Sequence, residues 1–205
     1  MTSLLIATHN PAKKQELNMG FSPLNKVNVD LLFLDDLKIK VDPEETGKTF
    51  GENASLKARC FAEISKLPTV ADDGGIEIDA LNGEPGVRSK RWLGRDAPDA
   101  EMIDFTINKL KDVPLEKRTA QFTVCLYYYN PINGYSASVS ESLKGHISLT
   151  PSGFARKGFP YRALFIVDAY SKYYDELTEE EHIKINHRLQ AVQKLIPLIK
   201  KDLLQ

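Results

Sequence analysis

The amino-acid sequence predicts an α/β domain with a mixed β-sheet, and three observations support that class. Short apolar runs alternate with amphipathic segments along the chain, as strands interleaved with helices do. Hydrophobic residues make up 42% of the chain, which argues against wholesale disorder. A chain of 205 residues can bury roughly 70% of its unfolded surface, so it needs no disulfide or metal to fold. We expect a single domain spanning residues 1–205.

The first 66 residues predict two strands and two helices. Residues 4–7 form a short apolar run, which is typical of a buried strand. Asn10 and Pro11 then begin a helix, because Asn is a favoured N-cap and Pro a favoured first helical residue. Residues 27–34 predict a second strand, and residues 50–66 predict an amphipathic helix.

An acidic segment follows this helix. Residues 69–71 predict a strand that runs into the sequence Asp-Asp-Gly-Gly at 72–75. The two glycines permit a sharp turn and the close approach of a ligand, and residues 76–79 alternate as a half-exposed strand does. Adjacent residues of a strand point to opposite faces, so Asp72 and Asp73 are expected to have different roles.

The second half of the chain predicts further strands and a helical C-terminal part. Apolar alternation over residues 122–128 predicts a long strand, which we expect to pair with residues 136–143. Thr178 and Glu181 form a capping box before one or two final helices, which end near Pro197 or just beyond it. The remaining expected elements are a helix at residues 100–110 and strands at residues 146–149 and 163–167.

The charge balance argues against two classes of partner. The chain has 27 basic and 28 acidic residues, a formal net charge of −1. Nucleic-acid binders and membrane-surface proteins normally carry an excess of basic residues, so neither nucleic acid nor membrane is expected. The longest uncharged stretch, residues 119–140, is broken by Asn, Pro, Gly and Ser and does not predict a membrane span.

The start of the chain and the cysteines lead us to expect a cytoplasmic protein. The first residues lack the basic segment and the long apolar core of a signal peptide. Cys60 and Cys125 form no Cys-x-x-Cys pair, and two isolated cysteines suit a reducing compartment.

The turn at residues 8–13 is a candidate anion site. It leads from a predicted strand into a predicted helix, whose first N–H groups and partial positive charge attract phosphate. Lys13 adds a full charge that opposes the helix dipole unless an anion is bound. Lys57 lies on or beside the apolar stripe of its helix, so it either reaches solvent or needs an anionic partner. An ordinary capped helix and a solvated lysine are the alternatives.

Asp72 and Asp73 are candidate metal ligands. Two adjacent acids at the end of a strand are costly to hold together unless a cation lies nearby. Carboxylate oxygens bind Mg²⁺, which usually keeps several waters and bridges to substrate phosphates. A polar turn without a ligand is the alternative.

Aromatic and cationic residues in the last quarter form a candidate base site. Residues 157–162 read Lys-Gly-Phe-Pro-Tyr-Arg, and Phe159 beside a glycine can stack on a nucleobase. Packing of Phe159 and Tyr161 in the core is the alternative. His187 and Arg188 are expected in the first turn of a final helix, where they could contact a base or a phosphate.

The combination and order of these features resemble the inosine/xanthosine triphosphate pyrophosphatase family over nearly the whole chain. The stretches that carry the resemblance are residues 7–13, 44–59, 67–75 and 85–91, with looser agreement at Gly158-Phe159, Tyr161 and His187-Arg188. The resemblance implies a two-lobed α/β fold with an elongated mixed sheet and a central cleft, and it implies homodimers. It also implies Mg²⁺-dependent hydrolysis of purine nucleoside triphosphates such as ITP, dITP and XTP to the monophosphate and pyrophosphate.

The resemblance further implies roles for individual residues. Asp73 is similar to the family's proton acceptor, with Asp72 beside it, and Glu45 and Asp73 are similar to its metal ligands. The implied substrate-binding residues are Thr8, His9, Asn10, Lys13, Lys57, Gly74, Phe159, Pro160, Tyr161, Arg162, His182, His187 and Arg188.

This chain departs from the family pattern mainly on the base side. Gly74 and Asn186 replace serines, His182 replaces a lysine, Pro160 replaces a glycine, and Arg162 replaces an acid. Because arginine only donates hydrogen bonds, we expect the base preference to shift toward acceptor-rich bases such as xanthine. An unchanged ranking of substrates in an Arg162→Asp variant would contradict that expectation. The alternatives are a related pyrophosphatase for another (d)NTP and an inactive nucleotide-binding homologue.

Overall fold

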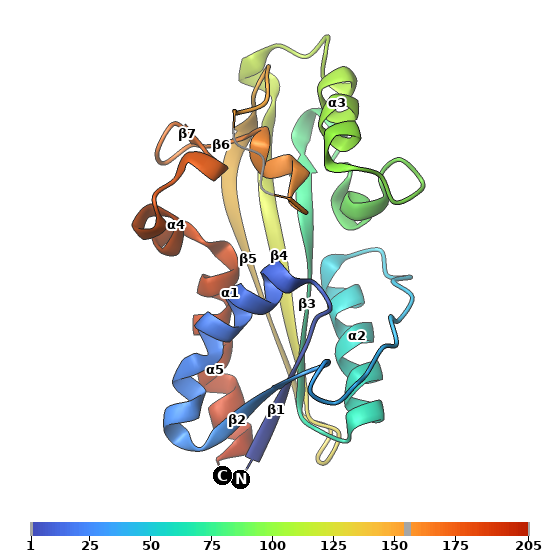
Figure 1. Cartoon of the computed structure of the whole chain (residues 1–205), viewed down its shortest axis with the longest axis vertical. Helices are drawn as coiled ribbons and strands as arrows, with labels where there is room; N and C mark the ends of the chain where they lie inside the picture. The colour runs from blue at the N-terminus through green and yellow to red at the C-terminus, as the bar shows by residue number, and fades with distance from the viewer. Residues whose placement is uncertain (1, 154–156, 205) are drawn as a thin grey trace. The chain divides into compact units, whose positions relative to one another are not determined.

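The computed structural model describes residues 2–153 and 157–204 and has a mixed β-sheet flanked by helices (Figure 1). Over these residues the strands are hydrogen-bonded in the order β2-β1-β3-β4-β5-β6-β7. The strands are β1 (Thr2–Ala7), β2 (Val29–Phe33), β3 (Thr69–Ile78), β4 (Thr119–Tyr129), β5 (Ser136–Ile147), β6 (Phe165–Val167) and β7 (Lys172–Tyr173). The helices are α1 (Pro11–Phe21), α2 (Phe50–Ser65), α3 (Asp99–Lys109), α4 (Glu179–Ile185) and α5 (His187–Leu203). The predicted fold class is confirmed.

The chain divides into two compact units. Unit 1 comprises the residues through Asp73, then Val124–Glu141 and the residues from His187 onward. Unit 2 comprises Gly74–Thr123 and Ser142–Asn186. The central cleft implied by the family resemblance stays a prediction.

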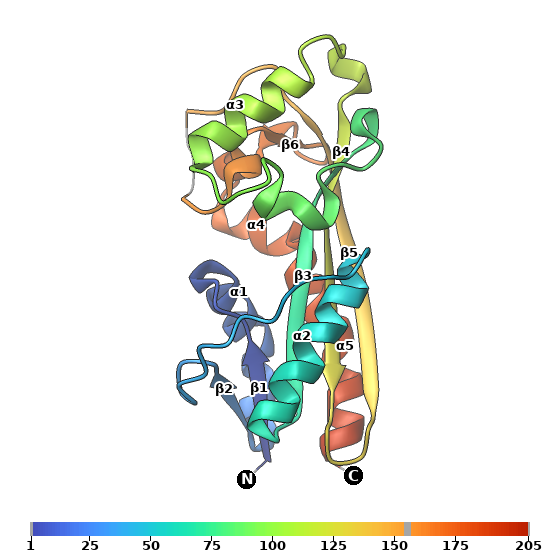
Figure 2. The ribbon, with the colours of Figure 1, turned by 90° about the vertical axis from the view of Figure 1, so that its right-hand side faces the viewer.

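Unit 1 is a sheet with helices on both faces, because β1 is apolar on both sides. Leu4 and Ile6 belong to the core cluster that includes residues of α1 and α5. Leu5 and Ala7 belong to a second cluster, which includes Phe61 of α2. Strand β1 runs parallel to both β2 and β3, and such sheets are normally covered on both faces. Figure 2 shows α2 and α5 beside the strands of this unit.

Unit 2 has its own core. Ile76 and Ile78 of β3 pack with Met102 of α3 and Phe165 of β6. The buried Arg118 donates to the backbone oxygens of Leu110 and Val113, just after α3, and of Ser148, just after β5. In this unit the end of β5 pairs antiparallel with β6, and β6 pairs antiparallel with β7.

The predicted helix caps are confirmed. The Asn10 side chain accepts from the N–H groups of Ala12 and Lys13 at the start of α1. Thr178 and Glu181 form the expected capping box of α4. Both final helices exist, and among the described residues no helix is long and apolar enough to cross a membrane.

Four expectations about the elements were wrong. Residues 72–75 form no sharp turn, because β3 continues through both glycines to Ile78. The strand expected at 146–149 is not a separate element, because β5 continues from Ser136 to Ile147. The strand expected at 163–167 is shorter, because Pro160–Ala163 forms a 3₁₀ turn before β6. Helix α5 continues past Pro197 to Leu203, since the burial of residues such as Leu195 and Ile199 outweighs the lost backbone hydrogen bond.

Gly75 allows close packing against a neighbouring segment rather than a turn. A Cβ atom at Gly75 would lie 2.7 Å from the Gly86 carbonyl oxygen and would also collide with the Ser89 side chain. Ser89 Oγ accepts from the Ile76 N–H at 3.1 Å, so the short helical segment Gly86–Arg91 packs directly on this strand. The close approach expected at this glycine is therefore made by the chain itself.

Candidate active site

The side chains of Asp72 and Asp73 belong to two different ionic clusters, both in unit 1. The Asp72 carboxylate lies 3.0 Å from Lys13 Nζ and 3.3 Å from Arg188 Nε. The Asp73 carboxylate lies 3.2 Å from Lys57 Nζ and accepts from Asn53 Nδ2 at 3.1 Å. Strand alternation, which predicted opposite faces for the two acids, explains the separation.

The Asp72 cluster is assembled from α1, β3 and α5. Lys13 stands in the first turn of α1, and Glu16 follows it by three residues on the same side of the helix. Glu16 forms an ion pair with Arg188 Nη1, and Arg188 in turn reaches Asp72. Asp72 is 2% exposed and Arg188 5% exposed, so this chain of alternating charges is largely removed from water.

The charge state of Asp72 follows from these neighbours. Burial alone would favour the neutral acid. The charges of Lys13, Arg188 and Lys57 outweigh that effect and hold the pKa of the Asp72 carboxyl well below its usual range. Asp72 is therefore a fixed negative charge that holds the Lys13 ammonium group in place.

The second cluster joins α2 to the segment before it. Lys57 Nζ lies 2.8 Å from Glu45 Oε1 and 3.2 Å from Asp73 Oδ1, so one ammonium group contacts both carboxylates. Burial opposes the charged lysine, but the carboxylates of Asp73, Asp72 and Glu45 raise its pKa above the ordinary value. Of the two environments expected for Lys57, the structure therefore shows the one with an anionic partner.

The pKa of Asp73 is shifted in the opposite direction from that of Asp72. Burial raises the pKa of the Asp73 carboxyl more than the charges of Lys57 and Lys13 lower it, and the nearby Glu45 carboxylate raises it further. Burial therefore makes the charged form of Asp73 less favourable, whereas the neighbouring cations keep Asp72 ionised.

Asn53 connects this carboxylate pair to the backbone. Its side chain is 1% exposed, accepts from the Gly47 N–H at 2.7 Å, and donates to Asp73 Oδ2. A Cβ atom at Gly47 would lie 2.6 Å from Asn53 Oδ1, so only glycine allows this close approach. Asn53 thereby fixes both Asp73 and the segment that carries Glu45.

The residues present suit Mg²⁺. Glu45 and Asp73 offer carboxylate oxygens within reach of one common cation, which is Lys57 Nζ in this structure. Among the described residues no three His, Cys, Asp or Glu side chains are grouped to hold a metal ion. Mg²⁺ in nucleotide enzymes is commonly held by one or two carboxylates plus substrate phosphates, so two carboxylates are a sufficient protein contribution.

The turn before α1 is ordered by its own side chains. Thr8 Oγ1 accepts from the Asn10 N–H at 3.2 Å, and Asn10 caps the helix. The ring of His9 lies 2.9 Å from the Val41 carbonyl oxygen and packs edge-on against the Phe61 ring. Lys13 is the member of this turn that the structure places against the paired acids.

The expected base-side residues of unit 2 form a separate group. Phe159 is half-buried, and the Arg162 guanidinium lies 3.9 Å from the centre of its ring. Tyr161 is buried and donates to the Ser89 carbonyl oxygen at 2.8 Å, so the core alternative holds for this residue. The His182 ring packs edge-on against Tyr174.

The remaining expected residues differ in environment. Gly74 lies within β3, and Pro160 begins the 3₁₀ turn that follows Phe159. His187 is buried at the first position of α5. Arg188 was expected to contact a base edge, and the structure places its guanidinium against Glu16 and Asp72.

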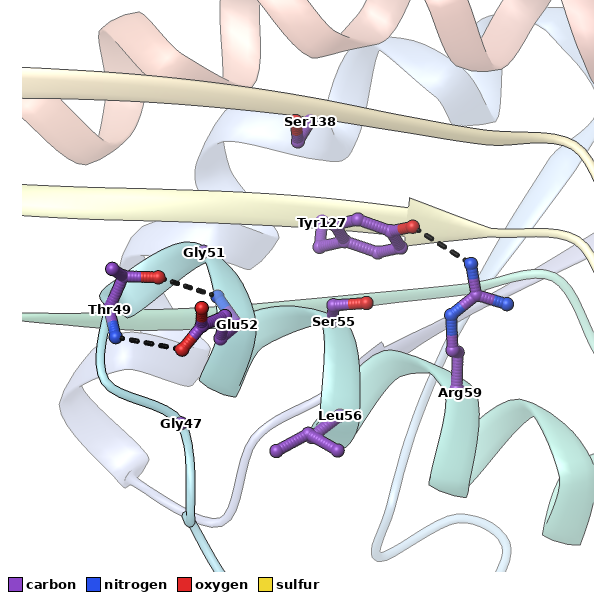
Figure 3. Close-up of a pocket in the computed structure, with 9 residues that line it drawn as sticks. All are labelled: Gly47, Thr49, Gly51, Glu52, Ser55, Leu56, Arg59, Tyr127 and Ser138. Atoms are coloured by element: carbon purple, nitrogen blue, oxygen red, sulfur yellow. Dashed lines mark hydrogen bonds between the residues drawn. The ribbon is translucent and has the colours of Figure 1, made fainter.

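An open groove in unit 1 is lined by residues of α2, the segment before it, and strands β4 and β5 (Figure 3). Its lining residues are Gly47, Thr49, Gly51, Glu52, Ser55, Leu56, Arg59, Tyr127 and Ser138. Arg59 donates to Tyr127 Oη at 3.0 Å and covers the Tyr129 ring at 4.3 Å. None of the expected site residues lines this groove.

The family model described as the Ham1 family matches residues 4–198, which is nearly the whole chain. The chain belongs to the Ham1 family. It is 38% identical over 197 residues to the dITP/XTP pyrophosphatase of Lactobacillus acidophilus, covering 96% of each chain. It is 37% identical over 201 residues to the dITP/XTP pyrophosphatase of Escherichia coli K12, covering 98% of this chain and 99% of the relative.

Solved structures of Ham1 proteins have the same fold. A HAM1 protein from Coxiella burnetii superposes with a TM-score of 0.86 at 31% identity, covering 98% of this chain and 100% of the other. A nucleoside-triphosphatase, or dITP/XTP pyrophosphatase, from Mycobacterium abscessus gives a TM-score of 0.78 at 36% identity, covering 96% and 100%. The family resemblance seen in the sequence motifs is confirmed.

Two residues of this Ham1 protein's ionic clusters were missed by the sequence analysis. Glu16 follows Lys13 by three residues, and Asn53 precedes Lys57 by four, so each shares a helix face with an expected site residue. That spacing was an available signal. What the sequence could not supply was the contact with Arg188, which is 172 residues away from Glu16.

Proposed function

We propose that this Ham1 family protein hydrolyses purine nucleoside triphosphates with altered bases, such as ITP, dITP and XTP. The products are the nucleoside monophosphate and pyrophosphate, and the reaction uses Mg²⁺. The names of the relatives support this substrate class, since curated relatives that align over almost the whole chain are dITP/XTP pyrophosphatases. The structure contributes the arrangement of charges that such a reaction needs.

One observation carries the proposal: adjacent acids on β3 each hold a lysine, Asp72 with Lys13 and Asp73 with Lys57. A triphosphate brings several negative charges, and pyrophosphate gains more as it leaves. Two ammonium groups fixed before the substrate arrives stabilise that developing charge without reorganisation. A protein that only binds proteins or lipids has no comparable use for two buried ion pairs, which are costly to desolvate.

Glu45 and Asp73 are the residues that would hold Mg²⁺. The ion supplies charge neutralisation of the phosphate oxygens and polarisation of the phosphorus when it is bound. Asn53 keeps the Asp73 carboxylate in place from the side opposite Lys57, because it occupies Oδ2 while the lysine contacts Oδ1. The carboxylate pair is thus oriented before any ligand binds.

The chain's own residues also provide proton transfer. A water molecule that attacks the α-phosphorus must lose a proton, and we propose that the Asp73 carboxylate accepts it. The new bond joins the water oxygen to the α-phosphorus, and the bond from that phosphorus to the bridging oxygen breaks. Pyrophosphate then leaves with its charge offset by Lys13 and Lys57. Asp72 acts by holding Lys13, since its own oxygen already contacts two cations.

The base side of the proposal rests on Phe159. Its half-buried ring can stack on a nucleobase, as aromatic rings commonly do. His182 and His187 are the residues we propose for contacts with the base edge, since the Arg188 guanidinium, also expected there, is held by Glu16 and Asp72. We also infer a homodimer and a cytoplasmic location; the family resemblance supports the former, and the two free cysteines, Cys60 and Cys125, suit the latter.

The inactive nucleotide-binding alternative is disfavoured by the same geometry. Gly74 replaces a family serine, but both lysines and three acidic groups keep their contacts. A binding protein gains little from two carboxylates that share one ammonium group. A related enzyme for a different (d)NTP would keep this machinery and differ only in base selection.

A triphosphate panel tests the proposal. The protein is incubated with Mg²⁺ and ITP, dITP, XTP, GTP, dGTP, ATP, dUTP or dTTP, and monophosphate and pyrophosphate are measured together. Monophosphate plus pyrophosphate from ITP or XTP, lost in Asp73→Asn, supports it. Turnover confined to ATP or to pyrimidine nucleotides refutes the substrate class, and absence of turnover with any nucleotide refutes the activity.

A further inference from the structure

We propose that Arg162 is a positioning residue for Phe159, and that it sets the affinity for all purine bases by stacking on that ring. This proposal rests on the proposed function, because it assigns the base contact of the same reaction to Phe159. It replaces the expectation that Arg162 donates hydrogen bonds to the base. If Arg162 donates hydrogen bonds to the base, its substitution should change the ranking of substrates. If it positions Phe159, its substitution should weaken the binding of all of them equally.

The Arg162 guanidinium lies over two aromatic rings. Its Cζ atom lies 3.9 Å from the centre of the Phe159 ring and 4.5 Å from the centre of the Tyr174 ring. Both distances are well within the range of a cation–π contact. The Arg162 residue is only 4% exposed, so its guanidinium is buried against these rings. A planar guanidinium stacks on aromatic faces in a way that lysine cannot match.

The segment around Phe159 is fixed at both of its ends. Asp99 Oδ2 accepts from the Gly158 N–H at 2.7 Å, and Gly158 has a φ of +83°, which favours glycine. On the other side, the Arg162 N–H donates to the Phe159 carbonyl oxygen at 3.1 Å. Tyr161 is held through its hydroxyl on the Ser89 carbonyl oxygen. These contacts fix the backbone around Phe159, and the Arg162 guanidinium fixes the orientation of the Phe159 ring.

The Arg162 guanidinium occupies one face of the Phe159 ring. A base that stacks on this ring would therefore use the opposite face. Stacking on a phenyl ring depends little on which groups the base carries at its edge, since every base has a π-face. Arg162 therefore acts on inosine, xanthine and guanine nucleotides alike, through the orientation of Phe159.

Arg162→Met tests this by keeping the length of the side chain and removing the guanidinium. We expect KM to rise by about three- to thirtyfold for ITP, XTP and GTP alike, the range that one desolvated cation–π contact carries. We expect kcat to change less than twofold, because the phosphate-binding residues are untouched. The inhibition constant of pyrophosphate, which has no base, should stay the same.

Arg59→Met is the matched control. Arg59 also covers tyrosine rings, at 4.3 Å from Tyr129 and 5.7 Å from Tyr127, but it is exposed and belongs to neither ionic cluster. Its substitution should leave KM and kcat unchanged. A loss of affinity in both variants would overturn the proposal, because it would show that the loss of any stacked arginine has this effect.

A double substitution tests whether Arg162 acts through Phe159. In a Phe159→Leu background there is no ring to position, so adding Arg162→Met should raise KM by less than twofold further. Additive effects would overturn the proposal. A change in the ranking of XTP against ITP in Arg162→Met would also overturn it and would restore the hydrogen-bonding role.

Two measurements keep the test informative. Folding of Arg162→Met is judged by the fluorescence of Trp92, which lies near Tyr161. If this variant does not fold, Arg162→Lys replaces it, and we expect a smaller rise in KM that is equal for all substrates. The affinities of the product IMP and of XMP, measured by calorimetry, require no turnover. Parent protein that binds IMP without hydrolysing any triphosphate refutes the proposed function, while the Arg162 comparison is still read from IMP affinity. Parent protein that does neither refutes both.

Discussion

Asp72 and Asp73 are neighbours in sequence, yet their carboxylates contact different lysines, Lys13 at 3.0 Å and Lys57 at 3.2 Å. One strand thereby supplies an acid to each of two clusters on its opposite faces. The two clusters differ in charge balance. Asp72 lies among three cations that keep it ionised, whereas burial raises the pKa of Asp73.

The two acids should therefore differ in their effect on stability. Asp72→Asn leaves Lys13 and Arg188 buried without that carboxylate, so we expect a loss of about 3 kcal/mol in the free energy of unfolding. Asp73→Asn should cost less, because Lys57 keeps its contact with Glu45. Urea unfolding of both variants checks this. Equal losses, or a larger loss for Asp73→Asn, would show that the two clusters are not distinct.

Asn53 should control metal affinity without contacting the metal. Asn53→Ala removes the link between Gly47 and Asp73, and loss of such a supporting hydrogen bond commonly costs about 10- to 100-fold in metal affinity. The check is the Mg²⁺ concentration at half-maximal activity, together with the rise in Tm that Mg²⁺ produces. Asn108→Ala, at an exposed position of α3, is the control. An unchanged Mg²⁺ dependence would remove Asn53 from the site.

Gly75 should tolerate no side chain. Gly75→Ala places a Cβ atom against Gly86 and Ser89, so we expect a loss of about 1–3 kcal/mol in unfolding free energy. Gly51→Ala is the matched control, because a Cβ there meets its nearest atom, Cys125 Sγ, at 3.7 Å. Since Gly51 lies in α2, alanine should be neutral or stabilising by up to about 1 kcal/mol. Thermal unfolding of both variants decides between these expectations.

Asp202 should make the stability of the fold depend on pH. It lies in the last turn of α5 and accepts from Tyr128 Oη, Asn130 Nδ2 and Asn133 Nδ2 at 2.6–2.7 Å. Partial burial would raise the pKa of the Asp202 carboxyl, but these hydrogen bonds lower it below the ordinary value. Its contribution is therefore complete above the ordinary pKa and is lost as the pH falls through the lower, folded-state pKa.

Asp202→Asn measures that contribution. We expect a lower Tm than the parent at pH 7, equivalent to about 1–3 kcal/mol for hydrogen bonds to a charged group. The difference should shrink as the pH falls below about 4, where the aspartate of the unfolded chain becomes protonated. Asp112→Asn, at an exposed position, should show no such difference. A gap in Tm that is the same at pH 7 and pH 3 would contradict the role of the carboxylate.

The sequence predicted local features well because they depend on local chemistry. The cap at Asn10, the capping box at Thr178 and the opposite orientation of Asp72 and Asp73 all follow from neighbouring residues. Family motifs then gave the fold. The turn expected at the two glycines was wrong because β3 continues through them as a strand between β1 and β4, and Gly75 allows close packing against Gly86 and Ser89.

Other features depend on contacts between distant segments. Arg188 reaches Asp72 across 116 positions of the sequence, and no local pattern predicts that pairing. Arg162 was interpreted from its hydrogen-bonding capacity alone, whereas its guanidinium lies over the rings of Phe159 and Tyr174. Charge and donor counts identify which residues matter at such positions, but only the fold shows which neighbour each residue contacts.

Hydrolysis of ITP in ¹⁸O-labelled water, with Mg²⁺ present, tests the central claim most directly. The account predicts IMP and pyrophosphate in equal amounts, with the label in the phosphate of IMP, since water attacks the α-phosphorus. Asp73→Asn should abolish both products. Label in pyrophosphate, release of orthophosphate with IDP, or full turnover by Asp73→Asn would contradict the account.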